Sequence, residues 1–251
     1  MRKIDPFASP KRRLARAKQH INRLGKRIQT FFKKHPAVST IEVDPDGFNV
    51  HCIKFARDFP DSWTDSAVEA IEALRSTLDQ CGYAAGVLGG ITNPKKAYFP
   101  FGDTPTELDN NVAGRCKDLR PEISALFRSF DSHERGNYAL WVLNKLCNAN
   151  KHRLLIPVGV SAGMHLHSGE ISGTGGIGVR WERDKNRITF ARIAPGSHFK
   201  YDANIAFHIA FDQFNGVKGG PAVGILNATA REVQRVLLAT EAECRRIGII
   251  T

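Results

Sequence analysis

The chain has 251 residues, of which 42% are apolar, enough to bury a hydrophobic core in one large domain or two small ones. Its net charge of +11 is localised, because twelve of the 36 Lys and Arg residues but only one of the 25 acids precede His35, leaving 24 of each sign beyond it. Five cysteines without a C-x-x-C pair argue against a disulfide framework and favour a cytoplasmic location, and the short apolar runs predict neither a secretory signal nor a membrane span.

The first predicted element is a basic amphipathic helix. Ser9 and Pro10 have the residue types preferred at an N-cap and at the first helical position, and Pro36 disfavours helical backbone at the residue before it. Between these limits, apolar residues recur every three or four positions and form a narrow stripe from Leu14 to Phe31. The stripe is expected to be buried, either on the rest of the chain or on a second copy, which makes a homo-oligomer one expected partner.

The other faces of this helix carry the positive charge. Lys and Arg side chains attract polyanions and neutralise phosphates without reading base sequence. Nucleic acid is therefore an expected partner of residues 1–34, and a solvated structural helix or a helix lying on an anionic membrane surface are the alternatives. The residues expected to contact nucleic acid are Arg12, Arg13, Arg16, Lys18, Arg23, Lys26 and Arg27.

A β-hairpin and a second helix are predicted next. Residues 38–43 and 48–53 alternate in polarity around the turn sequence Asp-Pro-Asp-Gly, which is typical of a hairpin. Ser62 and Asp65 resemble a capping box ahead of apolar residues at helical spacing, and Gly82 is the expected end of this helix.

The remaining elements change from helices to strands. A loop rich in Gly, Pro and Asn over residues 89–111 precedes helices predicted at 121–130 and 138–150. Residues 154–214 have the short alternating runs of strands, and a last helix is predicted at 221–247.

The segregation of strands from helices favours an α+β fold over a parallel doubly wound sheet. We expect a helical N-terminal half and an antiparallel β-rich C-terminal half closed by a long helix. The expected organisation is a basic helical arm at 1–36, a hairpin with helices at 37–153, and a β region with the last helix at 154–251. The last two ranges form either one domain or two.

Two helices carry polar residues on their predicted core faces. Arg75 lies on the apolar side of its helix, where a guanidinium needs an acidic partner, and Asp79 is one turn further on. Asn150 lies on the apolar side of the later helix. We expect Arg75, Asp79 and Asn150 to form one buried polar network, which either orients the helices or forms the floor of an anion-binding cleft. His152, on the opposite side, either contacts a ligand or helps to cap the helix C-terminus.

Two further motifs do not predict a site. Residues 173–178 match G-x-G-x-x-G, but a strand rather than a helix follows, so the glycines indicate a turn or bulge instead of a phosphate-binding loop. His165 and His167 share a face of a strand, yet no third ligand for a metal can be identified. The sequence therefore predicts no metal and no cofactor.

The order of these segments resembles a widespread family of bacterial proteins of uncharacterised function. The resemblance covers most of the chain and rests on the basic helix, an L-R-S-x-L-D-H pattern at residues 74–80, an F-P-[IF] loop at 99–101 and an L-x-x-L-x-N-x-D-K-H-R pattern at 143–153. The chain has Gln80 where the family has His, and Asn150 where it has Asp. The spacing of Arg and His in the first pattern is similar to that of HEPN domains, helical modules that bind or cleave RNA in bacterial defence and toxin systems.

Two functions from different classes remain open at this point. The preferred one is a binding or interaction protein whose cationic helix contacts nucleic acid, without catalysis. The alternative that the resemblance implies is a HEPN-like ribonuclease or phage-defence toxin. Its candidate catalytic residues are Arg75 and His152, because Gln80 has no imidazole for acid–base work.

Overall fold

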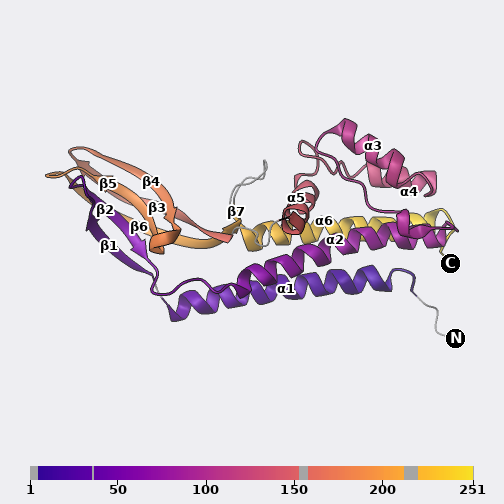
Figure 1. Ribbon diagram of the computed structural model, residues 1–251, viewed down its shortest axis with the longest axis horizontal. Helices are drawn as coiled ribbons and strands as arrows, with labels where there is room; N and C mark the ends of the chain where they lie inside the picture. The colour runs from indigo at the N-terminus through magenta and orange to yellow at the C-terminus, as the bar shows by residue number, and fades with distance from the viewer. Residues whose placement is uncertain (1–4, 36, 153–157, 212–219, 251) are drawn as a thin grey trace.

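Three long helices pack along one another and form the body of the molecule: α1 (Ala8–Lys34), α2 (Ser62–Leu88) and α6 (Ala222–Arg246). This computed structural model describes residues 5–35, 37–152, 158–211 and 220–250. The start of α1 and the end of α6 lie at the same end of the body, and the strands project from the other end (Figure 1). An ion pair between Lys11 and Glu241 joins α1 to α6 at the shared end, with 2.7 Å between the charged atoms.

The apolar stripe of α1 is buried inside the chain. Leu14, Ala17, Ile21 and Leu24 are almost fully buried and belong to the same core as residues of α2 and α6. The surface through which we expected a second copy to bind is therefore already covered by α2 and α6.

The ends of α1 differ in detail from the prediction. The helix begins at Ala8, so the N-cap is Phe7, a core residue whose backbone N–H donates to Asp5 Oδ1 at 2.9 Å. Ser9, the predicted N-cap, lies inside the helix and donates from its hydroxyl to Gln80 Oε1 of α2 at 2.9 Å. The C-terminal limit is correct, because α1 ends at Lys34 with His35 as its C-cap.

The second helix is longer than predicted at its C-terminal end. α2 passes through Gly82 and ends at Leu88. Gly82 is needed for a close approach rather than for a stop, since a Cβ there would lie 2.8 Å from the carbonyl oxygen of Ala97. The predicted capping box does not form either, because the N-cap is Asp61 and no side chain caps this end.

Three shorter helices form a lobe that packs on α2 and α6, namely α3 (Pro105–Arg115), α4 (Pro121–Arg128) and α5 (Tyr138–His152) (Figure 1). The prediction of a loop over 89–111 is wrong at α3 and at the short 3₁₀ turn η1 (Pro94–Lys96). Thr104 caps α3 by accepting a hydrogen bond from the Glu107 N–H at 3.2 Å, and Glu107 Oε2 accepts from the Asp103 N–H at 2.8 Å.

The strands form two antiparallel sheets, which confirms the α+β prediction. One sheet has the order β1-β2-β5-β4 and the other the order β3-β6-β7. The predicted hairpin is present, with Val38 opposite Lys54. Aromatic side chains of the two sheets meet, and the His51 ring contacts those of Phe199 and Tyr201. The strands are β1 (Val38–Val43), β2 (Asn49–Lys54), β3 (Val158–Ser172), β4 (Gly175–Glu182), β5 (Arg187–Ile193), β6 (His198–Phe211) and β7 (Gly220–Pro221).

The three predicted ranges interleave in space. The first sheet combines β1 and β2 from the second range with β4 and β5 from the third, and α6 packs on α1 and α2. A cluster of rings joins the helices to the first sheet where α1 ends and α2 begins; its members are Phe31, Phe32, Phe55, Phe59, Trp63 and Trp181. The helical body and the first sheet therefore share a continuous core.

Candidate functional site

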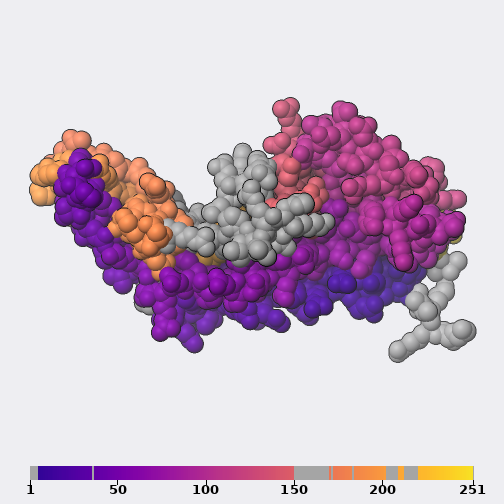
Figure 2. Space-filling view, in the orientation of Figure 1, coloured from indigo at the N-terminus to yellow at the C-terminus, as the bar shows by residue number. Residues whose placement is uncertain are grey.

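The exposed side of α1 carries a row of cations, which we call the basic face and define as Arg12, Arg13, Arg16, Arg23, Lys26 and Arg27. All six side chains are exposed, and in the part of the chain that the structure describes no carboxylate lies within ion-pairing distance of them. The helix that carries this face, α1, runs along one long edge of the molecule, at the lower side of Figure 1 and Figure 2. Its charge is therefore available to a ligand rather than neutralised by neighbours.

Lys18 does not belong to this face. Its side chain is half-buried between α1 and α6, and Nζ donates to Gln234 Oε1 at 2.7 Å. Among the seven residues predicted to contact nucleic acid, Lys18 therefore differs from the six exposed ones, because its side chain contacts α6.

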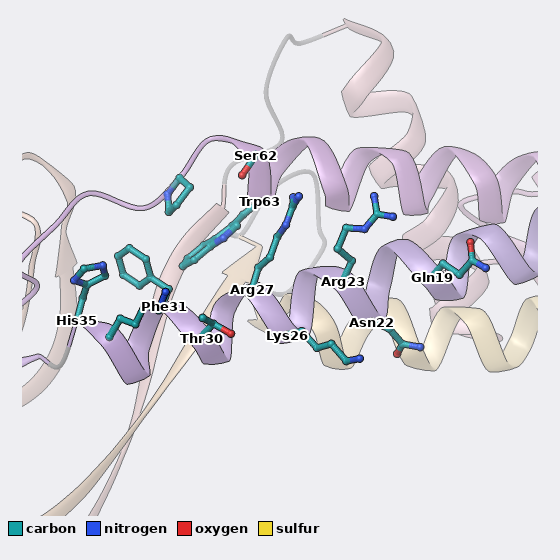
Figure 3. Close-up of a pocket in the computed structure, with 12 residues that line it drawn as sticks. Gln19, Asn22, Arg23, Lys26, Arg27, Thr30, Phe31, His35, Ser62 and Trp63 are labelled. Carbon is teal, nitrogen blue, oxygen red and sulfur yellow. The ribbon is translucent and has the colours of Figure 1, made fainter.

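The C-terminal half of the basic face borders a broad groove of about 780 Å³. Arg23 and Arg27 project from α1 toward α2, and Arg27 passes beside the Trp63 indole (Figure 3). Arg27 Nη1 donates to Ser66 Oγ at 3.3 Å, which holds this guanidinium at the groove. Lys26, Lys34 and His35 also line the groove, so positive groups predominate there.

The aromatic rings of the groove belong to its floor. Trp63 is only 3% exposed, and its ring stacks on Phe59 with 5.5 Å between centroids. Phe31 meets the Trp63 ring edge-on at 5.1 Å. These rings fix the end of α1 against the start of α2 and leave the cations as the groups that a ligand meets first.

A second polar site surrounds Arg75 on α2. The Arg75–Asp79 ion pair forms, with 3.3 Å between Nε and Oδ2, and the Arg75 side chain is 14% exposed. Arg75 Nη1 donates to Asn144 Oδ1 at 2.6 Å, and the guanidinium lies 4.2 Å from the centre of the Phe101 ring. The amide that we expected from Asn150 is thus supplied by Asn144, while the Asn150 side chain lies outside the described residues.

Three of the four segments on which the expected family resemblance rests meet at this guanidinium. Arg75 belongs to the first pattern, Phe101 to the F-P-F loop, and Asn144 and Asn148 to the last pattern. Together with residues of α3 they line a polar pocket of about 280 Å³. Sequence reasoning missed Asn144, although it follows Leu140 by one helical turn and so lies on the same side of its helix.

Hydrogen bonds occupy both carboxylates of the pocket. Asp103 accepts from Lys145 Nζ at 2.7 Å and from the Trp141 indole N–H at 2.9 Å. Burial opposes ionisation of Asp103, but these two hydrogen bonds outweigh it and lower the pKa of the carboxyl. Glu107 is engaged by the Asp103 N–H.

The two positions of the HEPN-like spacing do not share a pocket. Gln80 contacts α1 through Ser9, whereas Arg75 faces α3 and α5. The side chain of His152, the other catalytic candidate, lies outside the described residues.

Two motifs that predicted no site in the sequence were the G-x-G-x-x-G match at 173–178 and the histidines at 165 and 167. Gly173 has φ +105° and precedes β4, so the G-x-G-x-x-G match is a turn into a strand. No group of three potential metal ligands occurs in the described part of the chain, and the side chains of His165 and His167 lie outside it. All five cysteines are buried, and no disulfide joins them.

Comparisons of the chain with protein-family models, curated proteins and solved structures found no match. None of the described helices combines the length and apolar character needed to cross a bilayer.

Proposed function

We propose that the protein binds nucleic acid through the basic face of α1, by contacts to phosphates and without reading the base sequence. The observation that carries this proposal is the row of six exposed cations without a carboxylate partner among the described residues. From Arg12 to Arg27 the row spans about 22 Å of helix axis. A duplex presents a phosphate about every 1.7 Å of its axis, so several phosphates fit along the row.

The packing of α1 favours nucleic acid over a membrane surface. An amphipathic helix binds lipid by burying its apolar side between headgroups and acyl chains. In this protein that side is already buried, because Leu14, Ile21 and Leu24 lie in the core shared with α2 and α6. Only the charged side is left for a ligand.

The composition of the groove favours phosphates over bases. Binding by base stacking requires an aromatic face that is open to the ligand, but Trp63 is buried under its neighbours. Lys and Arg contacts to phosphates supply sequence-independent affinity through counterion release. The expected behaviour is binding of DNA and RNA of many sequences with a strong dependence on salt.

The test compares two triple variants that each remove three positive charges. The groove variant is Arg23→Gln, Lys26→Gln, Arg27→Gln, and the matched control is Lys95→Gln, Lys96→Gln, Lys117→Gln, whose cations are exposed but do not line the groove. With a fluorescent oligonucleotide of about 20 nucleotides at low salt, the groove variant should weaken binding by about tenfold or more. The control should change it by less than about threefold.

Equal losses in the two triple variants would contradict the proposal, because they would show that total charge rather than the basic face sets the affinity. Unchanged binding by the groove variant would contradict it as well.

A further inference from the structure

We propose that the pocket around Arg75 is a second binding site, which takes the phosphate group of a small phosphorylated molecule. The pocket is formed by α2, the loop before α3, α3 itself and α5. None of its lining residues lines the groove on α1, so the proposal does not depend on nucleic-acid binding.

Arg75 is held in position by its neighbours and still has N–H groups that donate to no described residue. Asp79 accepts from Nε, Asn144 accepts from Nη1, and the Phe101 ring covers the guanidinium. No described residue accepts a hydrogen bond from Nη2, although a guanidinium carries five N–H donors. A positively charged donor that is oriented before the ligand arrives loses little entropy on binding.

The pocket also contains hydrogen-bond donors that no described residue engages. Arg115 lines the pocket and has no carboxylate within ion-pairing distance among the residues described. The Asn144 oxygen is already engaged by Arg75, which leaves its NH₂ group to donate. Asn148 adds an exposed amide from one turn further along α5.

Each acidic group of the pocket already accepts at least one hydrogen bond from the chain. Asp103 accepts from Lys145 and Trp141, and Glu107 accepts from the Asp103 N–H. The charge of Asp103 is therefore balanced by Lys145, while Glu107 keeps one oxygen without a described donor. The balance of unused hydrogen-bonding capacity in the pocket favours an anion with several acceptor oxygens.

The placement of the donors selects phosphate over carboxylate. Arg75, Arg115 and Asn148 come from three different helices around the pocket, whereas a carboxylate offers two oxygens in one plane. A phosphate group presents three terminal oxygens in three directions. The volume of about 280 Å³ also leaves space for the molecule to which the phosphate is attached.

The test uses inorganic phosphate as the probe, with acetate at the same ionic strength as the comparison. We expect calorimetry of the full chain to show phosphate binding with a dissociation constant of about 1 mM or tighter and acetate binding at least about tenfold weaker. Arg115→Gln and Asn148→Ala alter side chains that make no hydrogen bond or ion pair with described residues, and each should weaken phosphate binding about fivefold or more.

Two controls separate this site from others. Arg57→Gln removes an exposed cation outside the pocket, and the Lys95, Lys96 and Lys117 triple variant removes three more; both should bind phosphate as the parent chain does. Absence of phosphate binding, equal binding of acetate, or a loss in the controls equal to that in Arg115→Gln would overturn the proposal. Failure of this site and failure of nucleic-acid binding are distinguishable, because Arg115→Gln and Asn148→Ala change the pocket and the groove triple variant changes α1.

Discussion

At the scale of single residues, two glycines inside helices have opposite roles. Gly82 faces the backbone of Ala97, and a Cβ there would lie 2.8 Å from its carbonyl oxygen. Gly25 faces only Val223, with 3.8 Å to the nearest atom, which is an ordinary contact distance. The sequence does not show this difference, because the roles of the two glycines depend on which atoms pack against them.

Alanine substitutions at these two positions should therefore change the free energy of unfolding in opposite directions. Gly82→Ala is expected to destabilise by about 1–3 kcal/mol, because the loop must move away. Gly25→Ala is expected to stabilise by about 0.5–1 kcal/mol, because alanine restricts the unfolded chain and favours the helix. Urea denaturation of the two variants measures both values, and a stabilised Gly82→Ala would contradict the close packing at that position.

Arg75 is important for stability as well as for the second site. Arg75→Ala removes the hydrogen bond to Asn144, the ion pair with Asp79 and the contact with Phe101. Because the pair is partly rather than fully buried, we expect a loss of about 2 kcal/mol, between the values for exposed and buried pairs. A loss below about 0.5 kcal/mol in chemical denaturation would show that the network contributes little.

His51 makes the stability of the sheets depend on pH. Burial against Phe190, Phe199 and Tyr201 lowers the pKa of His51 from its ordinary value of 6.5. Below pH 6.5 the unfolded chain binds a proton at His51 more readily than the folded chain does. The contribution of neutral His51 to the free energy of unfolding is therefore fully present above pH 6.5 and decreases as the pH falls.

The variant His51→Leu should lose stability less steeply than the parent chain between neutral and mildly acidic pH. Melting temperatures recorded across this range test the prediction. Parallel curves for the two proteins would contradict the prediction, because they would show that the pKa of His51 is the same in the folded and unfolded chains.

Among the helices, the spacing of apolar residues was sufficient to predict α1 but not α3. The apolar spacing from Leu14 onward predicts the helix and its buried stripe, and both are present. α3 was missed because it buries little more than Leu108 and so has almost no apolar period. Its signal was the cap, with Thr104, Pro105 and Glu107 in the order typical of a helix start.

Because α1 is buried on one side, substitutions on that side should lower the stability of the whole protein. Ile21 and Leu24 are each 1% exposed, so Leu24→Ala should destabilise the protein by about 2–5 kcal/mol. Ala15 is exposed on the same helix, and Ala15→Ser should cost less than about 0.5 kcal/mol. Denaturation of the two variants tests whether α1 is part of the body. Similar small losses in both would indicate a detached arm.

At the scale of the whole molecule, the fold class could be predicted but the assembly of the elements could not. Local patterns indicated helices, a hairpin and a β-rich segment, and these are present. Nothing local specifies that β2 pairs with β5, or that α6 returns to pack on α1 and α2. For the same reason the sequence singled out Arg75 and Asp79, but the pairing with Asn144 and Phe101 required the packing of α5 and the loop.

The salt dependence of DNA binding reports how many phosphates the basic face of α1 contacts. Each phosphate contact adds about 0.7 to the slope of log Kd against log salt concentration for single strands. The account predicts a steep slope for the full chain, a slope lower by about 2 for the variant Arg23→Gln, Lys26→Gln, Arg27→Gln, and a nearly unchanged slope for the Lys95, Lys96 and Lys117 control. A shallow slope for the full chain, or equal slopes for the full chain and the groove variant, would contradict phosphate binding by the basic face of α1.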